Sequence, residues 1–108
     1  MESQHSERIV QEVWAKGRAT ADADPNLWRK DACGAWMRRD HYGRAQSEFA
    51  WKIENVSAGG FETPENLRPF NCANSYDRAN ARSHCRLTAD LSGVPTPARV
   101  LEPRNRTA

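Results

Sequence analysis

The sequence predicts a single small α+β domain. An N-terminal segment repeats its apolar residues at the helical period, a central segment alternates apolar and polar residues, and turn-forming residues separate the two. With 108 residues, 38% of them hydrophobic, the chain supports one modest core. The tryptophans are expected to fill much of that core rather than to form a ligand platform. They are Trp14, Trp28, Trp36 and Trp51.

The first predicted element is a helix over residues 6–17. Its apolar residues recur on one helical face, from Ile9 to Trp14, and Gly17 is expected to end it. A loop with an Asp-Pro turn signal follows. Residues 1–26 are therefore predicted to form an N-terminal helix and loop.

Two strands are predicted next, after a short helical turn at residues 27–31. One strand covers residues 32–39. The other covers residues 49–56, where alternation of apolar and polar residues is typical of a half-buried strand. The linker between them contains Tyr42-Gly43, so we expect an antiparallel β-hairpin.

The remaining segments complete a predicted domain over residues 27–90. Residues 57–65 contain a glycine pair and form a loop, and residues 66–70 form a short extended piece whose proline suits a sheet edge. Residues 74–87 are predicted to form a second helix, which begins at a capping Asn or Ser. Residues 91–108 are rich in proline and poor in apolar residues, which predicts a flexible C-terminal tail.

Charge and hydropathy limit the partners and the cellular locations that the sequence predicts. The net charge of +2 is too small to establish a nucleic-acid partner, but residues 76–108 carry six arginines against three acidic residues, which permits an anionic partner there. The N-terminus has no apolar segment typical of a secretory signal, and no apolar run approaches the length of a membrane helix. We therefore expect a cytoplasmic protein with no membrane partner.

Three cysteines, Cys33, Cys72 and Cys85, are expected to be free thiols. An odd count without a secretory signal argues against a disulfide scaffold. A zinc site built from Cys72, His84 and Cys85, with Cys33 or His41, is the less favoured alternative. A structural zinc needs four ligands, and the chain has no Cys-x-x-Cys pair.

Several short motifs follow one another along the chain. They are Trp28–Arg39, Tyr42-Gly43, Trp51–Val56, Gly59-Gly60 and Asn66–Phe70. Their order and spacing resemble the HNH endonuclease family, also called the His-Me finger or ββα-metal family, over residues 9–87. The resemblance implies that the chain contains a ββα unit, an HNH-like domain, completed by the second helix.

The resemblance also implies that the catalytic positions are degenerate. The family has Asp-His, a metal ligand and a general base, where this chain has Glu54-Asn55. Asn66 matches the structural Asn of the family, and the second metal ligand corresponds to Ser75, with Asn74 beside it. Asn55 has no basic lone pair near neutral pH, the carboxylate of Glu54 is displaced by roughly 1.5 Å, and a serine is a weak metal ligand. No catalytic residue is therefore expected, and Glu54 with Asn74 would bind metal weakly if at all.

A divalent-metal-dependent HNH endonuclease or nickase is the alternative. It would need Mg²⁺ or another divalent ion and a different general base, either His41 or His84. The favoured interpretation needs no cofactor.

Arginines are the predicted contacts to a partner. Arg78, Arg82 and Arg86 recur every fourth residue, so on a helix they would form one positively charged face. The alternative, which the sequence favours equally, is that these arginines form a solvated helix surface with no partner. Arg38 and Arg39, on the predicted hairpin, are the second candidate.

The sequence thus predicts a non-catalytic, HNH-fold binding protein. Its partner would be nucleic acid or a nucleic-acid-handling protein complex, for example as a phage or mobile-element inhibitor of a host defence system. Fold alone does not decide among these partners, and the oligomeric state does not follow from the sequence.

Overall fold

The computed structural model describes residues 5–44, 46–90 and 103–108. One α-helix and eight short strands make up this part of the chain, with one-turn 3₁₀ helices at Arg39–His41 and Pro64–Asn66. The elements are α1 (Glu7–Trp14), β1 (Trp28–Lys30), β2 (Trp36–Arg38), β3 (Trp51–Asn55), β4 (Leu67–Asn71), β5 (Ser75–Asp77), β6 (Arg82–His84), β7 (Leu87–Ala89) and β8 (Asn105–Thr107). This mixture confirms a small α+β domain.

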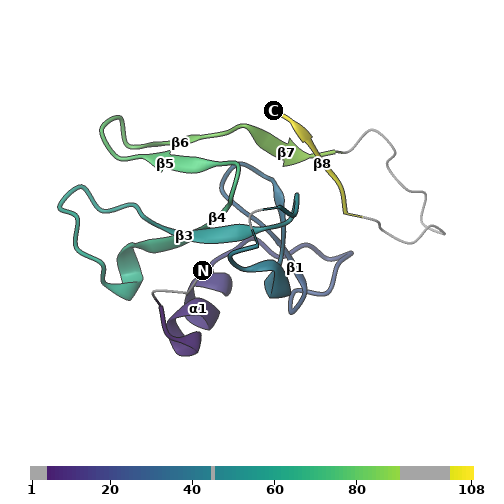
Figure 1. Cartoon of the computed structure of the whole chain (residues 1–108), viewed down its shortest axis with the longest axis horizontal. Helices are drawn as coiled ribbons and strands as arrows, with labels where there is room; N and C mark the ends of the chain where they lie inside the picture. The colour runs from purple at the N-terminus through teal and green to yellow at the C-terminus, as the bar shows by residue number, and fades with distance from the viewer. Residues whose placement is uncertain (1–4, 45, 91–102) are drawn as a thin grey trace.

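The described strands pair as four separate antiparallel ribbons, β1–β2, β3–β4, β5–β6 and β7–β8. In Figure 1, α1 lies on one side of the β3–β4 ribbon, and β5–β6 lies on the other. The β5–β6 and β7–β8 ribbons follow one another along the same side of the molecule (Figure 1). The longest ribbon, β3–β4, is therefore the centre of the fold.

Helix α1 forms where its apolar spacing predicts it. The Ser6 hydroxyl caps it by accepting a hydrogen bond from the Ile9 N–H at 3.3 Å. Its buried face packs against Met37, Trp51 and Leu67, and the Trp14 and Trp51 rings lie 5.2 Å apart between centroids. Three of the four tryptophans are buried and Trp28 is half-buried, which confirms their role in the core. No helix in the described ranges has the length and apolar character needed to cross a membrane.

Buried polar side chains, rather than a continuous sheet, join the ribbons. The Asp31 carboxylate accepts hydrogen bonds from the Cys33 and Ala35 N–H groups through Oδ1, and from the Asn71 N–H and the Asn74 amide through Oδ2. All four distances are 2.9 Å. Asp31 is only 3% exposed, so these bonds offset the cost of burying its charge.

Asn74 extends this network to the C-terminal ribbons. Its Oδ1 accepts from the Arg86 and Leu87 N–H groups, and its Nδ2 donates to the Leu87 carbonyl. Asn71 donates from Nδ2 to the carbonyls of Trp36 and Glu48. Together with Asp31, these two buried amides tie β2, β4, β5 and β7 into one body.

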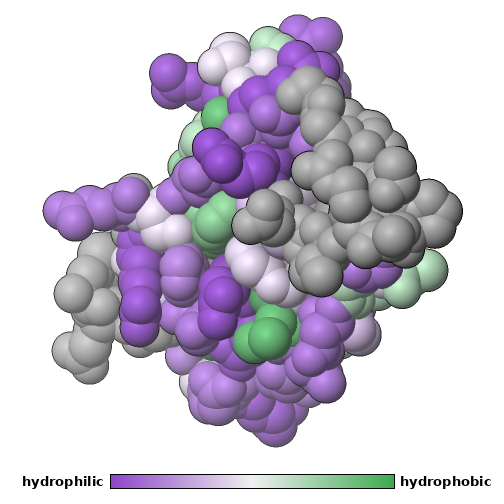
Figure 2. All heavy atoms as spheres, turned by 90° about the vertical axis from the view of Figure 1, so that its right-hand side faces the viewer, coloured by the Kyte–Doolittle hydropathy of each residue, from purple (hydrophilic) through white to green (hydrophobic). Residues whose placement is uncertain are grey.

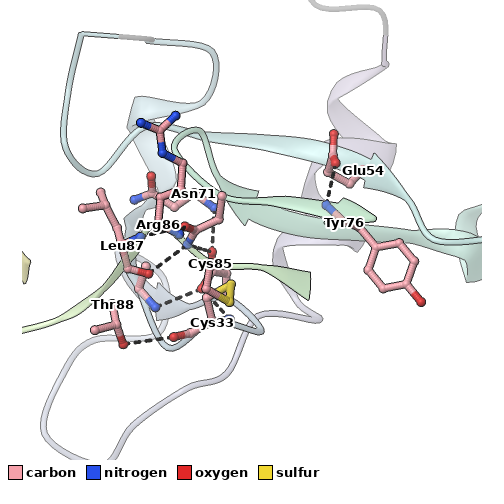
Figure 3. Close-up of a disulfide and its surroundings, with 11 residues drawn as sticks. Cys33, Glu54, Asn71, Tyr76, Cys85, Arg86, Leu87 and Thr88 are labelled. Carbon is pink, nitrogen blue, oxygen red and sulfur yellow. Dashed lines mark hydrogen bonds between the residues drawn. A yellow bond between two sulfur atoms is a disulfide. The ribbon is translucent and has the colours of Figure 1, made fainter. Parts of the chain in front are cut away.

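A disulfide joins Cys33 to Cys85, 52 residues apart in sequence (Figure 3). Their Cα atoms lie 5.5 Å apart, within the usual range for a disulfide. The expectation of three free thiols is therefore wrong for these two residues and right for Cys72, which is free and half-buried. The pairing arises because the turn after β1 lies against the corner between β6 and β7, where the Thr88 hydroxyl also donates to the Cys33 carbonyl at 3.0 Å.

The predicted second helix is wrong. Residues 74–87 form β5, β6 and the start of β7, and the turn between β5 and β6 places Ala81 at φ 53°. Asp77 accepts from the N–H and the amide of Asn80, which closes this turn. Because Asn74 bonds across to residues 86 and 87 rather than to the next helical turn, its side chain favours the ribbon over a helix.

Two further expectations are corrected. Residues 27–31 contain β1 rather than a helical turn, and the strand expected at 32–39 is shortened to β2, which pairs with β1 instead of with β3. Strand β3 confirms the prediction at 49–56, but its partner is β4, which confirms the extended piece at 66–70. The predicted tail is wrong at residues 105–107, which form β8 beside β7, and residues 91–102 lie outside the described residues.

Candidate functional site

The residues that the sequence resemblance predicted at degenerate catalytic positions form hydrogen bonds to the backbone. The Glu54 carboxylate accepts from the Tyr76 N–H at 3.0 Å and so joins β3 to β5 (Figure 3). Asn55 accepts from the Ser57 N–H at 2.8 Å, and Asn66 donates to the Phe61 carbonyl at 3.2 Å. Asn55 and Asn66 therefore order the β3–β4 loop, and Glu54 holds β5 beside β3. These structural roles need neither a metal ion nor proton transfer.

The predicted ligand sets do not come together. Among the described residues, no group of three or more His, Cys, Asp or Glu side chains could hold a metal ion. Cys85 is in the disulfide, which contradicts the zinc alternative that used its thiolate. Asn74 is buried with both side-chain atoms hydrogen-bonded, and Ser75 lies opposite His84 in the β5–β6 ribbon.

The predicted arginine face is rearranged by the change from helix to ribbon. Arg78, Arg82 and Arg86 are all exposed, but they are spread along the turn, β6 and the following corner instead of stacking on a helix. Because β6 side chains alternate, Arg82 and His84 share the outer face, whereas Ser83 faces inward. The three arginines remain available to solvent.

Arg38 and Arg39 are already occupied by acidic neighbours. Arg38 bonds the Asp40 carboxylate at 2.7 Å, and this hydrogen bond lowers the pKa of Asp40. Arg39 contacts the carboxylate of Glu7 and lies 5.9 Å from the Trp51 ring centroid. This pair is therefore a weaker candidate for a partner contact than the sequence predicted.

The structure contains a basic pocket that the sequence interpretation missed. It has a volume of about 340 Å³ and is bounded by the segment after α1, the end of β1, β4, and the inner face of the β5–β6 ribbon. Its walls include four cationic side chains, Lys16, Arg18, Lys30 and Arg68, together with Tyr76 and Ser83. We call these four cations and their surroundings the basic pocket.

Two of the cations stand directly opposite each other. Arg18 and Lys30 form an antiparallel bridge, in which the Arg18 N–H donates to the Lys30 carbonyl at 2.8 Å and the Lys30 N–H donates back at 2.9 Å. Side chains of such a pair project to the same face, and like charges in this position repel each other. The Lys30 ammonium lies 4.8 Å from the centroid of the Trp36 ring, which offsets part of that cost.

The other two cations converge on one carbonyl. The Lys16 ammonium donates to the Leu67 carbonyl at 3.0 Å and contacts that of Pro64, and Arg68 donates to the Leu67 carbonyl at 2.8 Å. Burial and the nearby Arg68 guanidinium lower the pKa of Lys16. The protein thus holds two positive charges close together at this side of the pocket.

In the part of the chain that the structure describes, no carboxylate forms an ion pair with a pocket cation, although the charges of Glu65 and Glu12 act on Lys16 and oppose the lowering of its pKa. The ion pairs found there within 4.0 Å involve Arg8, Arg38, Arg39 and His41, and none involves a pocket cation. The one carboxylate in the pocket wall, Asp31, is engaged by four protein donors. The four cations outnumber the carboxylates near them, and this excess of positive charge favours an anion in the pocket.

Only a weak sequence signal marks this pocket. Its cations come from three segments, and the nearest to a pattern is Lys16-Gly17-Arg18, where a Cβ on Gly17 would stand 3.0 Å from the Arg29 Cβ. Gly17 lets β1 approach this segment closely, which brings Arg18 to Lys30.

Comparison of the chain with protein-family models, with curated proteins and with solved structures gave no match.

Proposed function

We propose that the chain is a non-catalytic binding protein for nucleic acid and that the basic pocket takes a phosphate of the backbone. The observation that carries the proposal is the set of four pocket cations, none of which forms an ion pair within 4.0 Å among the described residues. A phosphate between Arg18 and Lys30 would replace their repulsion with two attractive contacts. Arginine and lysine are the side chains that bind phosphate best.

The choice of nucleic acid over a small anion rests on two further considerations. The sequence motifs resemble those of the HNH family, which implies a nucleic-acid ligand, although residues 74–87 form a ribbon instead of the second helix of that family. In addition, the exposed Arg78, Arg82 and Arg86 offer phosphate contacts beyond the pocket. The face drawn in Figure 2 is largely hydrophilic, with apolar residues in separate spots where the atoms are coloured.

The absence of catalysis in this proposal follows from the chemistry of the degenerate positions. Asn55 has no basic lone pair, and its side-chain oxygen already accepts from Ser57. The nuclease alternative would require His41 or His84 as base. His41 contacts the Ser47 hydroxyl at 2.6 Å, and His84 lies exposed on β6. Metal-dependent nicking of plasmid DNA that disappears in His84→Ala or Glu54→Ala would establish that alternative.

Arg18→Ala tests the pocket, because it should weaken binding without lowering the stability of the protein. Removing one of two opposed cations should leave the free energy of unfolding unchanged or slightly higher. It should nevertheless raise the Kd for an oligonucleotide about tenfold and flatten its dependence on salt by about one phosphate contact. Fluorescence anisotropy at several salt concentrations and urea unfolding measure the two effects.

Arg8→Ala is the matched control. Arg8 is exposed on α1, pairs with Glu12 and carries the same charge, so its removal tests net charge alone. If Arg8→Ala and Arg18→Ala weaken binding equally, the pocket has no special role and the proposal fails. If Arg18→Ala weakens binding only to an acidic protein, the partner is a protein complex, and salt should then act mainly on the association rate.

Two narrower expectations remain proposals. One is that the chain is a phage or mobile-element protein, which inhibits a host defence system by binding to its partner there and occupying it. The other is a cytoplasmic location. The Cys33–Cys85 disulfide argues against it, because structural disulfides persist mainly in oxidising compartments.

A further inference from the structure

The β3–β4 loop presents an exposed aromatic ring in an ordered setting. Phe61 is 71% exposed, much the larger exposure of the two large apolar residues that stand out on the described surface. Its ring lies against Gly59, where an added Cβ would stand 3.3 Å from the ring. Gly60 beside it has φ +78°, a conformation that suits glycine. The loop therefore turns sharply and leaves the ring facing solvent.

Hydrogen bonds fix this loop on both sides of Phe61. The Gly59 N–H donates to the Ser57 hydroxyl at 3.1 Å, and the Ser57 N–H in turn donates to Asn55. On the other side, Asn66 donates to the Phe61 carbonyl and to the Thr63 hydroxyl. Ordering the loop in advance lowers the entropy that a ligand must overcome, so the exposed ring is presented rather than loosely held.

An arginine lies beside this aromatic loop. The Arg78 guanidinium is 3.7 Å from the position a Cβ would take on Gly60. The β3–β4 loop and the turn of the β5–β6 ribbon project to the same end of the molecule in Figure 1. A flat ring with an adjacent guanidinium matches the two surfaces that unpaired bases and their phosphates need, a stacking face and a bidentate donor.

The loop also lies within reach of the basic pocket. Val56 is in the pocket wall, and Phe61 follows it by five positions, at most about 18 Å of extended chain. A strand a few nucleotides long is therefore able to place one phosphate in the pocket and a base from further along the strand on the ring.

We infer that Phe61 and Arg78 form a stacking site for an unpaired base, so that the ligand is single-stranded nucleic acid. This inference rests on the proposed function and names its partner class. In a duplex the bases stack on one another and offer no free face, so the ring gains nothing from double-stranded nucleic acid.

The test compares a short thymidine oligonucleotide with an abasic oligonucleotide of the same length, which has the same phosphates and no bases. Phe61→Leu keeps an apolar side chain but removes the aromatic face, and Phe61→Tyr keeps the face. Leu27→Ala, at the other exposed apolar residue, is the control. Because Phe61 is exposed, thermal unfolding should show all three variants folded, and anisotropy gives their affinities.

Phe61→Leu should weaken binding of the thymidine oligonucleotide about tenfold, within the usual range for base–aromatic stacking, and leave the abasic one unchanged. Phe61→Tyr and Leu27→Ala should bind both as the wild type does. Equal binding of the thymidine oligonucleotide by Phe61→Leu and wild type would overturn the inference, as would an equal loss for both oligonucleotides.

The same measurements separate this inference from the proposed function. If Arg18→Ala weakens both oligonucleotides and Phe61→Leu weakens neither, the pocket function stands and the stacking site is wrong. If Phe61→Leu acts selectively and Arg18→Ala does not act, the stacking site stands and the pocket function is wrong. A wild-type protein that binds neither oligonucleotide overturns both.

Discussion

Loss of the Cys33–Cys85 disulfide should destabilise the protein without changing its native structure. The bond closes a loop of 52 residues, and loop-closure entropy in the unfolded chain predicts a loss of about 4 kcal/mol. The native contacts at the same place survive, because Thr88 still donates to the Cys33 carbonyl and the Ala89 N–H to that of Gly34. The effect should therefore come mainly from the unfolded chain.

Urea unfolding of the double variant Cys33→Ser/Cys85→Ser measures this loss. With an m value of about 2 kcal/mol per M, the midpoint should fall by about 2 M relative to the oxidised wild type. Reductant should have the same effect on the wild type in native buffer, because Cys85 is exposed. Cys72→Ser, which leaves the disulfide intact, is the control and should stay responsive to reductant.

Two results would refute this reasoning. A thiol titration of the unfolded protein without reductant should find one reactive thiol, and finding three would show that the disulfide is not formed. A double variant whose free energy of unfolding lies within about 0.5 kcal/mol of the wild type would show that the bond does not constrain the unfolded chain as loop closure requires.

Three other predictions concern single residues. Asp31→Asn should lower the free energy of unfolding, measured in urea, by about 3 kcal/mol. Four protein donors face the buried Asp31 carboxylate, and the amide turns one of its two acceptor oxygens into a donor group. A loss below about 1 kcal/mol would contradict the network. Burial raises the pKa of the Cys72 thiol, so iodoacetamide at pH 8 should alkylate it severalfold more slowly than free cysteine, and an equal rate would argue against that burial. Burial and Arg68 lower the pKa of Lys16, so its charge is lost as pH rises through a value below 10.5, and oligonucleotide affinity should fall over that range. Lys16→Arg should remove this dependence, and its persistence would assign the titration to another group.

Elements with a strong local pattern were predictable from the sequence. Helix α1 follows from the periodic apolar residues between Ile9 and Trp14, and β3 follows from alternation around Trp51. Residues 74–87 have no such pattern, since Tyr76 and Leu87 are almost their only large apolar residues. The helix expected there rested on Asn74 or Ser75 as an N-cap, whereas the ribbon depends on hydrogen bonds that Asn74 accepts from the N–H groups of Arg86 and Leu87, 12 and 13 positions away.

The site was harder to predict because it depends on tertiary contacts. Arg18 and Lys30 lie 12 positions apart in sequence and meet only through a bridge outside the regular strands. Arg68 joins them from β4. The disulfide posed the same difficulty, because three cysteines without a spacing motif allow three pairings and only the folded backbone selects one.

Pairing in twos leaves each described strand with one long side that no other strand occupies. Exposed strand edges are templates on which further copies of a chain can add, so this architecture carries an intrinsic risk of self-association. Two features reduce it. Most of the strands are three residues long, and in the longer β3–β4 ribbon Pro69 has no N–H to offer a neighbour. Substitutions that lengthen these strands, or that replace Pro69 with a β-branched residue, should therefore promote aggregation.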